Sequence, residues 1–294
     1  MARLALDRVV VEGAPRRRLD GVSIEVGDGD FVGLVGGSGS GKTTLLRAVA
    51  GLDRVASGRV RIEERDVTDD EPRERDIGMV FQMPALIGHL SARRNVSFPL
   101  EVRHRDAEEI RHRVDAEARA LHIEQLLERE PSTLSHGEQQ MVQIARALVR
   151  APRLLLLDEP FASLDEYLRS RMRAEIALLQ AGYGVTTLMA TNEPADVMSL
   201  TSSLIVLDEG RVVQQGPTSQ VRESPATLTA AAATGSLSLV DMTVVADGTG
   251  FWLMRDDPGG GELVRIRVWS PAYRAHVGSI VAVAFRPEQL VVSP

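Results

Sequence analysis

The sequence contains no cysteine, which excludes disulfides, thiol catalysis and cysteine-bound zinc. Long apolar runs are also missing, since none approaches the roughly 18 residues that a membrane-spanning helix needs. Arg3, Asp7 and Arg8 interrupt the first eight positions, where a signal peptide would carry an apolar stretch. We therefore expect a soluble, intracellular protein.

Basic residues do not outnumber acidic ones: 34 Lys and Arg stand against 41 Asp and Glu, a formal net charge of −7. Because nucleic-acid binding requires a basic face, this balance argues weakly against it. The local cluster Arg16-Arg17-Arg18 is accordingly interpreted as a solvated loop rather than a binding patch. With 44% apolar residues over 294 positions, the chain can bury a substantial core in one large or two modest domains.

Lysine occurs only once, at position 42. It stands in Gly36-Gly37-Ser38-Gly39-Ser40-Gly41-Lys42-Thr43, which has the Gly-x-x-x-x-Gly-Lys-Thr spacing of a phosphate-binding loop. A compact ammonium fits between a β- and a γ-phosphate, where the wider, planar guanidinium of arginine would collide with the loop. The sequence therefore predicts a nucleotide-binding site at this loop.

The residues on either side of the loop have the character that the motif requires. Residues 31–35 are apolar and predict a buried parallel strand, and residues 44–50 predict a helix. The glycines allow backbone N–H groups to point inward around an anion, and the helix directs its positive N-terminal end at the same phosphates. Thr43 is predicted to hold Mg²⁺.

A second element of the same kind of site ends at Asp158 and Glu159. Residues 153–157 predict a buried strand, and two carboxylates at its end would be costly without partners. One carboxylate can approach Mg²⁺ through water, while the next can orient or deprotonate the attacking water. We predict these two roles for Asp158 and Glu159, respectively.

The chain changes character along its length. Up to about residue 222, short apolar runs alternate with helical ones, which predicts an α/β domain whose parallel sheet is covered on both faces. Residues 84–150 predict a helical insertion, with a charged helix over 106–130. Residues 223–236 are predicted to be a linker. Residues 237–294 alternate apolar and polar positions between turns, which predicts a small all-β domain, a barrel.

Further motifs lie in a fixed order around these elements. They are Gln82 after Met79-Val80-Phe81, Leu134-Ser135-His136-Gly137-Glu138-Gln139-Gln140, and Phe161-Ala162-Ser163-Leu164-Asp165. In this order they resemble the ATP-binding cassette subunits of ABC transporters, over almost the whole of residues 1–222. Residues 78–91 and 94–100 look like the maltose-type importer branch, as does Phe285-Arg286-Pro287-Glu288-Gln289-Leu290. The resemblance implies a P-loop NTPase cassette with a helical subdomain and a small C-terminal β domain of the OB/TOBE-like type.

The resemblance also implies a role for each matching residue. ATP phosphates would be held by the loop and the start of its helix, namely Gly36, Gly37, Ser38, Gly39, Ser40, Gly41, Lys42, Thr43 and Thr44. Thr43 and Asp158 would order Mg²⁺, with Gln82 sensing the metal and the γ-phosphate. Glu159 would be the catalytic base. Ser135 and Gly137 would reach the γ-phosphate held by a second cassette, and Asp165 would shape that interface.

Three features depart from the family pattern. The family's adenine-stacking aromatic is missing near the end of the first strand, because the first aromatic is Phe31, so Val11 or a neighbour would offer an apolar contact. In the signature, His136 replaces a glycine and Glu138 replaces a glutamine, which would add a carboxylate near an anionic ligand. Asn192 stands where the family has its switch histidine, and an amide cannot carry positive charge or shuttle a proton. Hydrolysis in this chain's own site is therefore expected to be slow.

Together these features predict an ATPase that couples hydrolysis of ATP to import of a sugar or related polar solute at the cytoplasmic face of the cell membrane. The implied partners are transmembrane permease subunits, a second and non-identical cassette subunit, and, indirectly, an extracytoplasmic solute-binding protein, with no nucleic acid. One alternative is a hydrolysis-impaired structural or regulatory cassette beside an active partner. Another is a non-transport cassette of DNA repair or translation, which the acidic balance and residues 81–100 disfavour.

Overall fold

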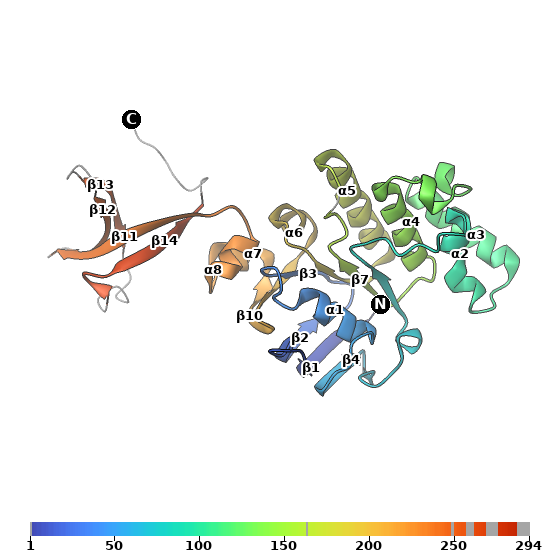
Figure 1. The fold of residues 1–294 in the computed structure, drawn as a ribbon, viewed down its shortest axis with the longest axis horizontal. Coiled ribbons are helices and arrows are strands. Elements are labelled where there is room, and N and C mark those ends of the chain that lie inside the picture. The colour runs from blue at the N-terminus through green and yellow to red at the C-terminus, as the bar shows by residue number, and fades with distance from the viewer. Residues whose placement is uncertain (1, 163, 248–249, 257–261, 269–275, 287–294) are drawn as a thin grey trace. The chain divides into compact units, whose positions relative to one another are not determined.

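The computed structural model describes residues 2–162, 164–247, 250–256, 262–268 and 276–286. The chain divides into two compact units, Met1–Thr234 and Gly235–Pro294. The first unit contains two β-sheets and the α-helices, and the second is a small β-rich unit (Figure 1). Within the described ranges, no helix has both the length and the apolar character that a membrane span requires.

A six-stranded sheet forms the centre of the first unit, in the order β10-β9-β3-β8-β7-β6. Its strands are β3 (Phe31–Val35), β6 (Ile77–Val80), β7 (Leu154–Asp158), β8 (Thr186–Ala190), β9 (Ser203–Asp208) and β10 (Arg211–Pro217). Neighbours from β9 to β6 run parallel, whereas β10 pairs antiparallel with β9. Strands β3, β7 and β8 are buried along their whole length, as parallel strands covered on both faces are. The predicted α/β architecture with a parallel sheet is confirmed.

The first unit also contains a second sheet, which has four antiparallel strands. Its order is β2-β1-β4-β5, with β1 (Leu4–Val11), β2 (Leu19–Val26), β4 (Ser57–Ile62) and β5 (Arg65–Asp66). Helix α1 (Lys42–Ala50) packs with both sheets, because Leu45 of α1 shares one buried core with Leu4 of β1 and Leu156 of β7. The glycine loop that precedes α1 is therefore attached to a helix that both sheets hold in place.

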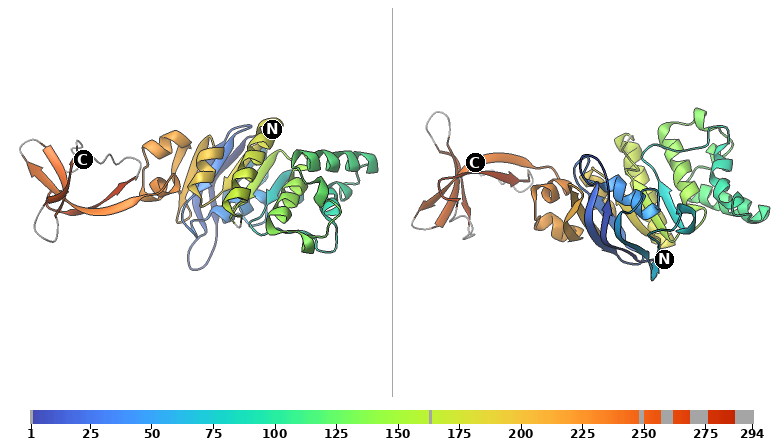
Figure 2. Two further views of the ribbon diagram at one scale, coloured as in Figure 1. Left: turned by 90° about the horizontal axis from the view of Figure 1, so that it is seen from above. Right: turned by 60° about the horizontal axis from the view of Figure 1, so that its bottom comes forward.

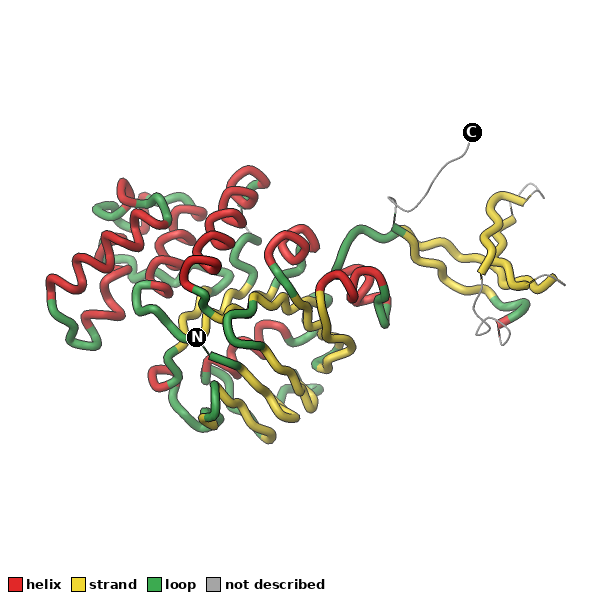
Figure 3. The backbone as a smooth tube through the Cα atoms, turned by 180° about the vertical axis from the view of Figure 1, so that it is seen from behind, coloured by secondary structure: helices red, strands yellow, loops and turns green. Residues whose placement is uncertain are grey.

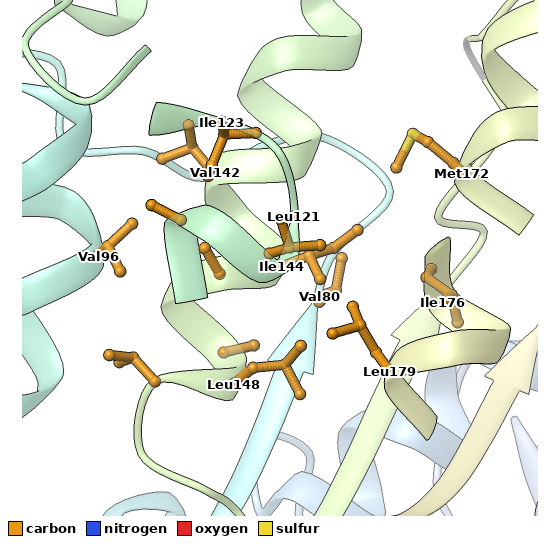
Figure 4. Packing of buried hydrophobic residues seen from close by; sticks show 14 of the residues in the cluster. Val80, Val96, Leu121, Ile123, Val142, Ile144, Leu148, Met172, Ile176 and Leu179 are labelled. Carbon is orange, nitrogen blue, oxygen red and sulfur yellow. The ribbon is translucent and has the colours of Figure 1, made fainter. Parts of the chain in front are cut away.

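The helical insertion packs against the helix that follows β7. The insertion contains α2 (Ala92–Glu101), α3 (Ala107–Ala120) and α4 (His136–Leu148), with short 3₁₀ turns η2 (Glu124–Leu126) and η3 (Pro131–Thr133). The turn η1 (Pro72–Glu74) precedes it, and the helices α5 (Glu166–Tyr183) and α6 (Pro194–Leu200) follow it. Val96 of α2, Ile144 of α4 and Ile176 of α5 belong to one buried cluster (Figure 4). Both views of Figure 2 show α2 to α4 as one green group of helices.

The charged helix predicted over residues 106–130 is too long. In the structure α3 ends at Ala120. Leu121 is fully buried, His122 adopts a left-handed backbone with φ 53°, and Ile123 returns to the same core. Burial of these two apolar side chains turns the chain inward and ends the helix, although the charge pattern continues.

The stretch predicted as a linker, residues 223–236, is ordered for most of its length. Helices α7 (Thr218–Glu223) and α8 (Leu228–Ala233) both lie in the first unit. Ala230 of α8 is buried in a small core with Val35 of β3 and Val206 of β9. The alanine run, which was predicted to be part of a linker, supplies the buried face of a short helix.

The second unit is an antiparallel sheet in the order β13-β12-β11-β14. Figure 3 draws its strands in yellow. Its strands are β11 (Ser238–Asp247), β12 (Gly250–Asp256), β13 (Glu262–Val268) and β14 (Ile280–Phe285). Met242, Val244 and Leu253 form its small core. The predicted β-rich C-terminal region is confirmed, but the described strands form an open sheet with β13 and β14 at its edges rather than a barrel. Residues 287–290 of the importer-like segment lie outside the described residues.

Arg75 fixes the C-terminal end of α1. Its side chain is 4% exposed, and Nη1 donates to the carbonyl oxygens of Ala48 and Val49, each at 2.9 Å. Nη2 donates to Thr68 O at 2.9 Å, and Nε donates to Asp70 O at 3.0 Å. A cation at this end of a helix is favoured by the helix dipole and satisfies carbonyls that have no partner within the helix.

We expect Arg75→Met to lower the free energy of unfolding by roughly 2–4 kcal/mol, because two buried and two partly buried hydrogen bonds to carbonyl oxygens are lost. The shift is measured by urea unfolding followed by circular dichroism. Arg73→Met is the matched control, since Arg73 is exposed and pairs with the exposed Glu71. Its expected effect is within about 0.5 kcal/mol. Equal midpoints for the two variants would contradict the role given to Arg75.

Candidate active site

Polar residues gather where four neighbouring parallel strands end. In the sheet order β3-β8-β7-β6, the glycine loop follows β3, Asn192 follows β8, Glu159 follows β7 and Gln82 follows β6. Ligand sites of open parallel sheets form outside such carboxyl ends. These residues line one pocket with a volume of about 620 Å³, together with Ser38, Gly39, Gly41, Lys42, Thr43 and Thr44. The structure thus brings most of the predicted phosphate-site residues together.

The backbone of the glycine loop has a shape that side chains would not permit at two positions. Gly36 has φ 151°, and a Cβ there would lie 2.1 Å from the carbonyl oxygen of Leu207. Gly41 has φ 110°, and a Cβ there would lie 2.8 Å from the carbonyl oxygen of Arg18. Gly41 is also the N-cap of α1 and gives the helix no side-chain cap. The first N–H groups of α1 are therefore left for an anion, and the loop curls around that helix end.

Lys42 crosses this loop. Its Nζ donates to the carbonyl oxygens of Gly36 at 2.9 Å and Gly37 at 3.0 Å, and the residue is only 5% exposed. Burial lowers the pKa of Lys42, while the nearby carboxylates of Glu159 and Asp158 raise it. The phosphate loop therefore surrounds a positively charged ammonium, and this charge favours binding of a polyphosphate.

Asp158 and Thr43 place two oxygen donors side by side, next to the phosphate loop. Thr43 Oγ1 donates to Asp158 Oδ1 at 3.0 Å, and Asp158 is 5% exposed. Burial raises the pKa of Asp158, which the Thr43 hydrogen bond and Lys42 oppose. A hydroxyl and a carboxylate are hard oxygen ligands that suit Mg²⁺, which usually takes few protein ligands and completes its shell with water and phosphate. The adjacent hydroxyl of Thr43 and carboxylate of Asp158 fit this mode of binding.

Glu159 lies at the mouth of the pocket between two side-chain amides. Gln82 Nε2 donates to its Oε2 at 3.3 Å, and Asn192 Nδ2 donates to its Oε1. Its backbone is left-handed, with φ 44°, and its N–H donates to Ala190 O at 2.9 Å. Burial raises the pKa of Glu159, Lys42 lowers it, and Asp158 raises it. The two donors orient a carboxylate whose position next to the phosphate loop suits a proton acceptor.

The segment that carries Gln82 is held by a residue that the sequence analysis missed. Gln143 of α4 is fully buried, and its Nε2 donates to Phe81 O at 3.1 Å. Its Oε1 accepts from the backbone N–H of Ala85 at 2.7 Å. Gln143 therefore fixes the chain on both sides of Gln82. It stands three residues beyond the signature-like motif, and a glutamine among the apolar positions of that helix is the one sequence signal that could have indicated it.

The signature-like residues are not part of this pocket. Ser135 is the N-cap of α4, and Glu138 completes a capping box: Ser135 N donates to Glu138 Oε2 at 2.7 Å, and Glu138 N donates to Ser135 Oγ at 3.3 Å. Arg129 also approaches Glu138, at 3.4 Å. The carboxylate that was expected near an anionic ligand is thus bound, within its own chain, by a backbone N–H and a guanidinium.

Gly137 and Asp165 also lie outside the pocket that holds Lys42. Gly137 occupies the first turn of α4, and a Cβ there would be 3.1 Å from Leu164. Asp165 is the N-cap of α5 and accepts from Leu168 N at 2.9 Å. Within the described ranges, neither residue lines the pocket of its own chain. Their predicted contact with a nucleotide therefore requires a second cassette.

Part of the pocket wall is formed by residues for which the sequence predicted another role. The expected apolar contact was Val11 or a neighbour, and Val11 itself is 3% exposed and belongs to the core. The pocket wall instead comes from the β1–β2 loop, Ala14, Pro15, Arg16, Arg17 and Arg18, and from Glu209 and Gly210. The interpretation of the arginine cluster as solvated loop is therefore incomplete, because its residues also face the pocket. The loop comes close only through the fold, and no spacing in the sequence indicates that.

Comparison with known proteins identifies the family. The family model described as ABC transporter matches residues 19–162. The chain is 44% identical over 240 residues to the sn-glycerol-3-phosphate import ATP-binding protein UgpC of Brucella abortus (strain 2308), covering 81% of this chain and 68% of that protein. It is 38% identical over 296 residues to the protein of the same name from Salmonella typhi, covering 100% of this chain and 81% of that protein.

Solved structures of related proteins have the same fold. A dimeric ATP-binding cassette, MJ0796, in a post-hydrolysis state bound to ADP and Pi aligns with a TM-score of 0.66 and 29% identity, over 73% of this chain and 98% of its own. A nucleotide-free cassette from an ABC transporter aligns with a TM-score of 0.70 and 26% identity, over 79% and 99%. The resemblance drawn from the sequence motifs is confirmed. The chain belongs to the ABC transporter family as an ATP-binding subunit, an ATPase coupled to transmembrane transport.

Proposed function

We propose that this chain binds and hydrolyses ATP to drive an importer of a sugar or related polar solute. The observation that carries the proposal is the single pocket in which Lys42, Thr43 and Glu159 meet at the carboxyl ends of the parallel strands. The cargo of the relatives, sn-glycerol 3-phosphate, makes a small phosphorylated polyol the first candidate solute. Permease subunits would hold the chain at the cytoplasmic face of the membrane, and an extracytoplasmic solute-binding protein would act through them.

The residues of the pocket divide the chemistry between them. Residues 36–44 would bind the β- and γ-phosphates through backbone N–H groups and the ammonium of Lys42. The oxygen of a water molecule attacks the γ-phosphorus, the bond to the bridging oxygen breaks, and ADP leaves with that oxygen. Glu159 accepts the proton of the water, and the amides of Gln82 and Asn192 keep its carboxylate oriented. Mg²⁺, held by Thr43 and Asp158 with Gln82 close by, would neutralise charge on the phosphates when bound.

We propose that two copies of the chain face each other to complete two ATP sites. Ser135, Gly137 and Asp165 lie outside the pocket of their own chain, so a second cassette is needed to bring them to a nucleotide. The expectation of a non-identical partner has no support in the comparisons, and the related cassette MJ0796 is dimeric. A different partner was expected because Glu138 and Asn192 depart from the family pattern. In this chain Glu138 completes a capping box and Asn192 donates to Glu159, so neither departure requires a different partner. The hydrolysis-impaired alternative is likewise without support.

The proposed cargo is tested with the assembled transporter in lipid vesicles. The chain is purified with the permease subunits that associate with it, and ATP turnover is measured with a binding protein and either sn-glycerol 3-phosphate or glycerol. We expect stimulation by the phosphorylated solute and not by glycerol. Stimulation by an unrelated class of solute, such as an amino acid, would overturn the proposed cargo, and no association with a permease would overturn the proposed importer.

Asn192→Asp should lower turnover roughly 10²-fold, because the isosteric change replaces the donor to Glu159 with a second carboxylate beside the γ-phosphate. The matched variant is Asn192→His, which keeps an N–H donor and should turn over at least as fast as the wild type. Both are compared in the assembled transporter by phosphate release under saturating ATP. If Asn192→Asp hydrolyses ATP at the wild-type rate, Asn192 does not position Glu159.

A further inference from the structure

Two sets of residues of different chemistry line the pocket. Lys42, Gln82, Glu159 and Asn192 form the set where the phosphates would lie. The other set is the β1–β2 loop, residues 14–18. Among the described residues that line the pocket there is no aromatic side chain, so a nucleotide base beside this loop needs another flat surface to stack on.

Arg18 is placed to provide such a surface. Its carbonyl oxygen lies against Gly41 of the phosphate loop, since a Cβ on Gly41 would be 2.8 Å from it. Its side chain passes over Gly13: a Cβ on Gly13 would lie 2.8 Å from Arg18 Cγ and 3.4 Å from Arg18 Nε. The same Cβ would lie 2.7 Å from the carbonyl oxygen of Arg16, so any larger residue at position 13 would displace the Arg16 backbone or the Arg18 side chain. The glycine makes room for the arginine side chain beside the loop that binds the phosphates.

The guanidinium of Arg18 is tethered at one edge. Arg18 Nη1 lies 3.5 Å from Asp53 Oδ2, and Asp53 is itself held by Arg47 of α1 at 3.0 Å. The side chain of Arg18 is 56% exposed, so an edge-on contact leaves a face of the plane open to the pocket. The other two arginines of the loop are bound more closely.

Arg16 contacts Glu209 at 2.7 Å. Arg17 contacts Asp20 at 2.9 Å and Glu12 at 3.4 Å. These shorter contacts bind the guanidinium of Arg16 to a carboxylate of the β9–β10 turn and that of Arg17 to carboxylates beside its own loop. Arg18 is therefore the member of the cluster with a packed aliphatic stem, a loose tether and a position next to the phosphate loop.

We propose that Arg18 is the stacking surface for the adenine base, with Gly13 as the position that permits it. A guanidinium is planar, delocalised and weakly hydrated, and it stacks on aromatic rings and on bases. The phosphates would bind at Lys42 while the base lies on Arg18, so Arg18 is a specificity-determining residue of the same site. This inference rests on the proposed binding of ATP.

The test distinguishes stacking of the base on the guanidinium plane from attraction of the phosphates by its positive charge. The full chain is titrated by calorimetry with MgATP and with magnesium tripolyphosphate, which has the phosphates but no base. Arg18→Ala should weaken MgATP binding about 5- to 30-fold and tripolyphosphate binding less than twofold. Arg18→Tyr, which keeps a flat side chain without the charge, should restore most of the MgATP affinity. Arg18→Lys, which keeps the charge without the plane, should resemble Arg18→Ala.

The control is Arg59→Ala, an exposed arginine of the same antiparallel sheet that pairs with Asp66 at 3.9 Å and lies outside the pocket. It should bind both ligands like the wild type, and all variants should keep the wild-type melting temperature. Restoration by Lys rather than Tyr, or equal loss for both ligands, would show that Arg18 acts as a charge and would overturn the inference. Unchanged affinity in Arg18→Ala would also overturn it. A wild-type chain that binds neither ligand would instead refute the proposed ATP site.

Discussion

Lys42→Ala is expected to weaken ATP binding roughly 100-fold or more. The ammonium is buried in the phosphate loop, and charge-assisted hydrogen bonds to phosphate oxygens contribute about 1.5–3 kcal/mol each. Lys42 is also the chain's only lysine, and no other lysine can take its place. The affinity is measured by calorimetric titration of the full chain with MgATP.

Lys42→Arg is the informative companion, because it keeps the positive charge. The ammonium lies 2.9 and 3.0 Å from the carbonyl oxygens of Gly36 and Gly37, a span that a planar guanidinium would enter only by moving the loop. We therefore expect Lys42→Arg to bind ATP almost as poorly as Lys42→Ala. Wild-type affinity in Lys42→Ala would refute the site, and wild-type affinity in Lys42→Arg alone would refute the size argument.

Glu159→Gln is expected to lower ATP turnover in the assembled transporter by roughly 10²–10⁴-fold, the usual range for loss of a positioned proton acceptor. The amide keeps the size of the side chain but cannot accept the proton of the attacking water. Binding of ATP should stay within about threefold of the wild type, because Lys42 and the backbone of the loop are unchanged. Turnover is followed by phosphate release and binding by calorimetry on the same preparations.

A neighbouring carboxylate provides the contrast. Glu193 is exposed and pairs with Arg169 at 3.2 Å, outside the pocket. Glu193→Gln should therefore leave turnover within about twofold of the wild type. Turnover in Glu159→Gln close to that of the Glu193→Gln control would mean that another group takes the proton, and the assignment of Glu159 as the base would fail.

The predictable part of the fold and site depends on local sequence. The apolar run of residues 31–35, the glycines after it and the helix-forming run after Lys42 are adjacent in the chain, and their spacing indicates one strand, loop and helix. Asp158 and Glu159 at the end of an apolar run are recognisable for the same reason. The strand ends then meet because parallel strands place their carboxyl ends at one edge of a sheet.

The parts that were not predicted depend either on contacts between distant residues or on local signals that were interpreted otherwise. Arg18 meets Gly41 and Gly13 through the fold, and no pattern around residues 16–18 indicates that the loop faces the nucleotide pocket. The Ser-x-x-Glu spacing of Ser135 and Glu138 is typical of a capping box. The box was not predicted, because Glu138 was interpreted as a departure from the family signature. Helix α8 was not predicted because a run of alanines has no alternation of apolar and polar residues that would indicate a buried face. The structure shows that face through the burial of Ala230.

The most direct test of the account is the composition of the ATP-bound complex. Glu159→Gln protein is mixed with MgATP and analysed by native mass spectrometry, because slow hydrolysis should preserve the closed state. The account predicts a complex of two identical chains with two bound ATP molecules, which dissociates to single chains when Lys42→Ala is added to the same variant. A single chain at saturating MgATP, or a stable complex that forms without nucleotide in the double variant, would contradict it.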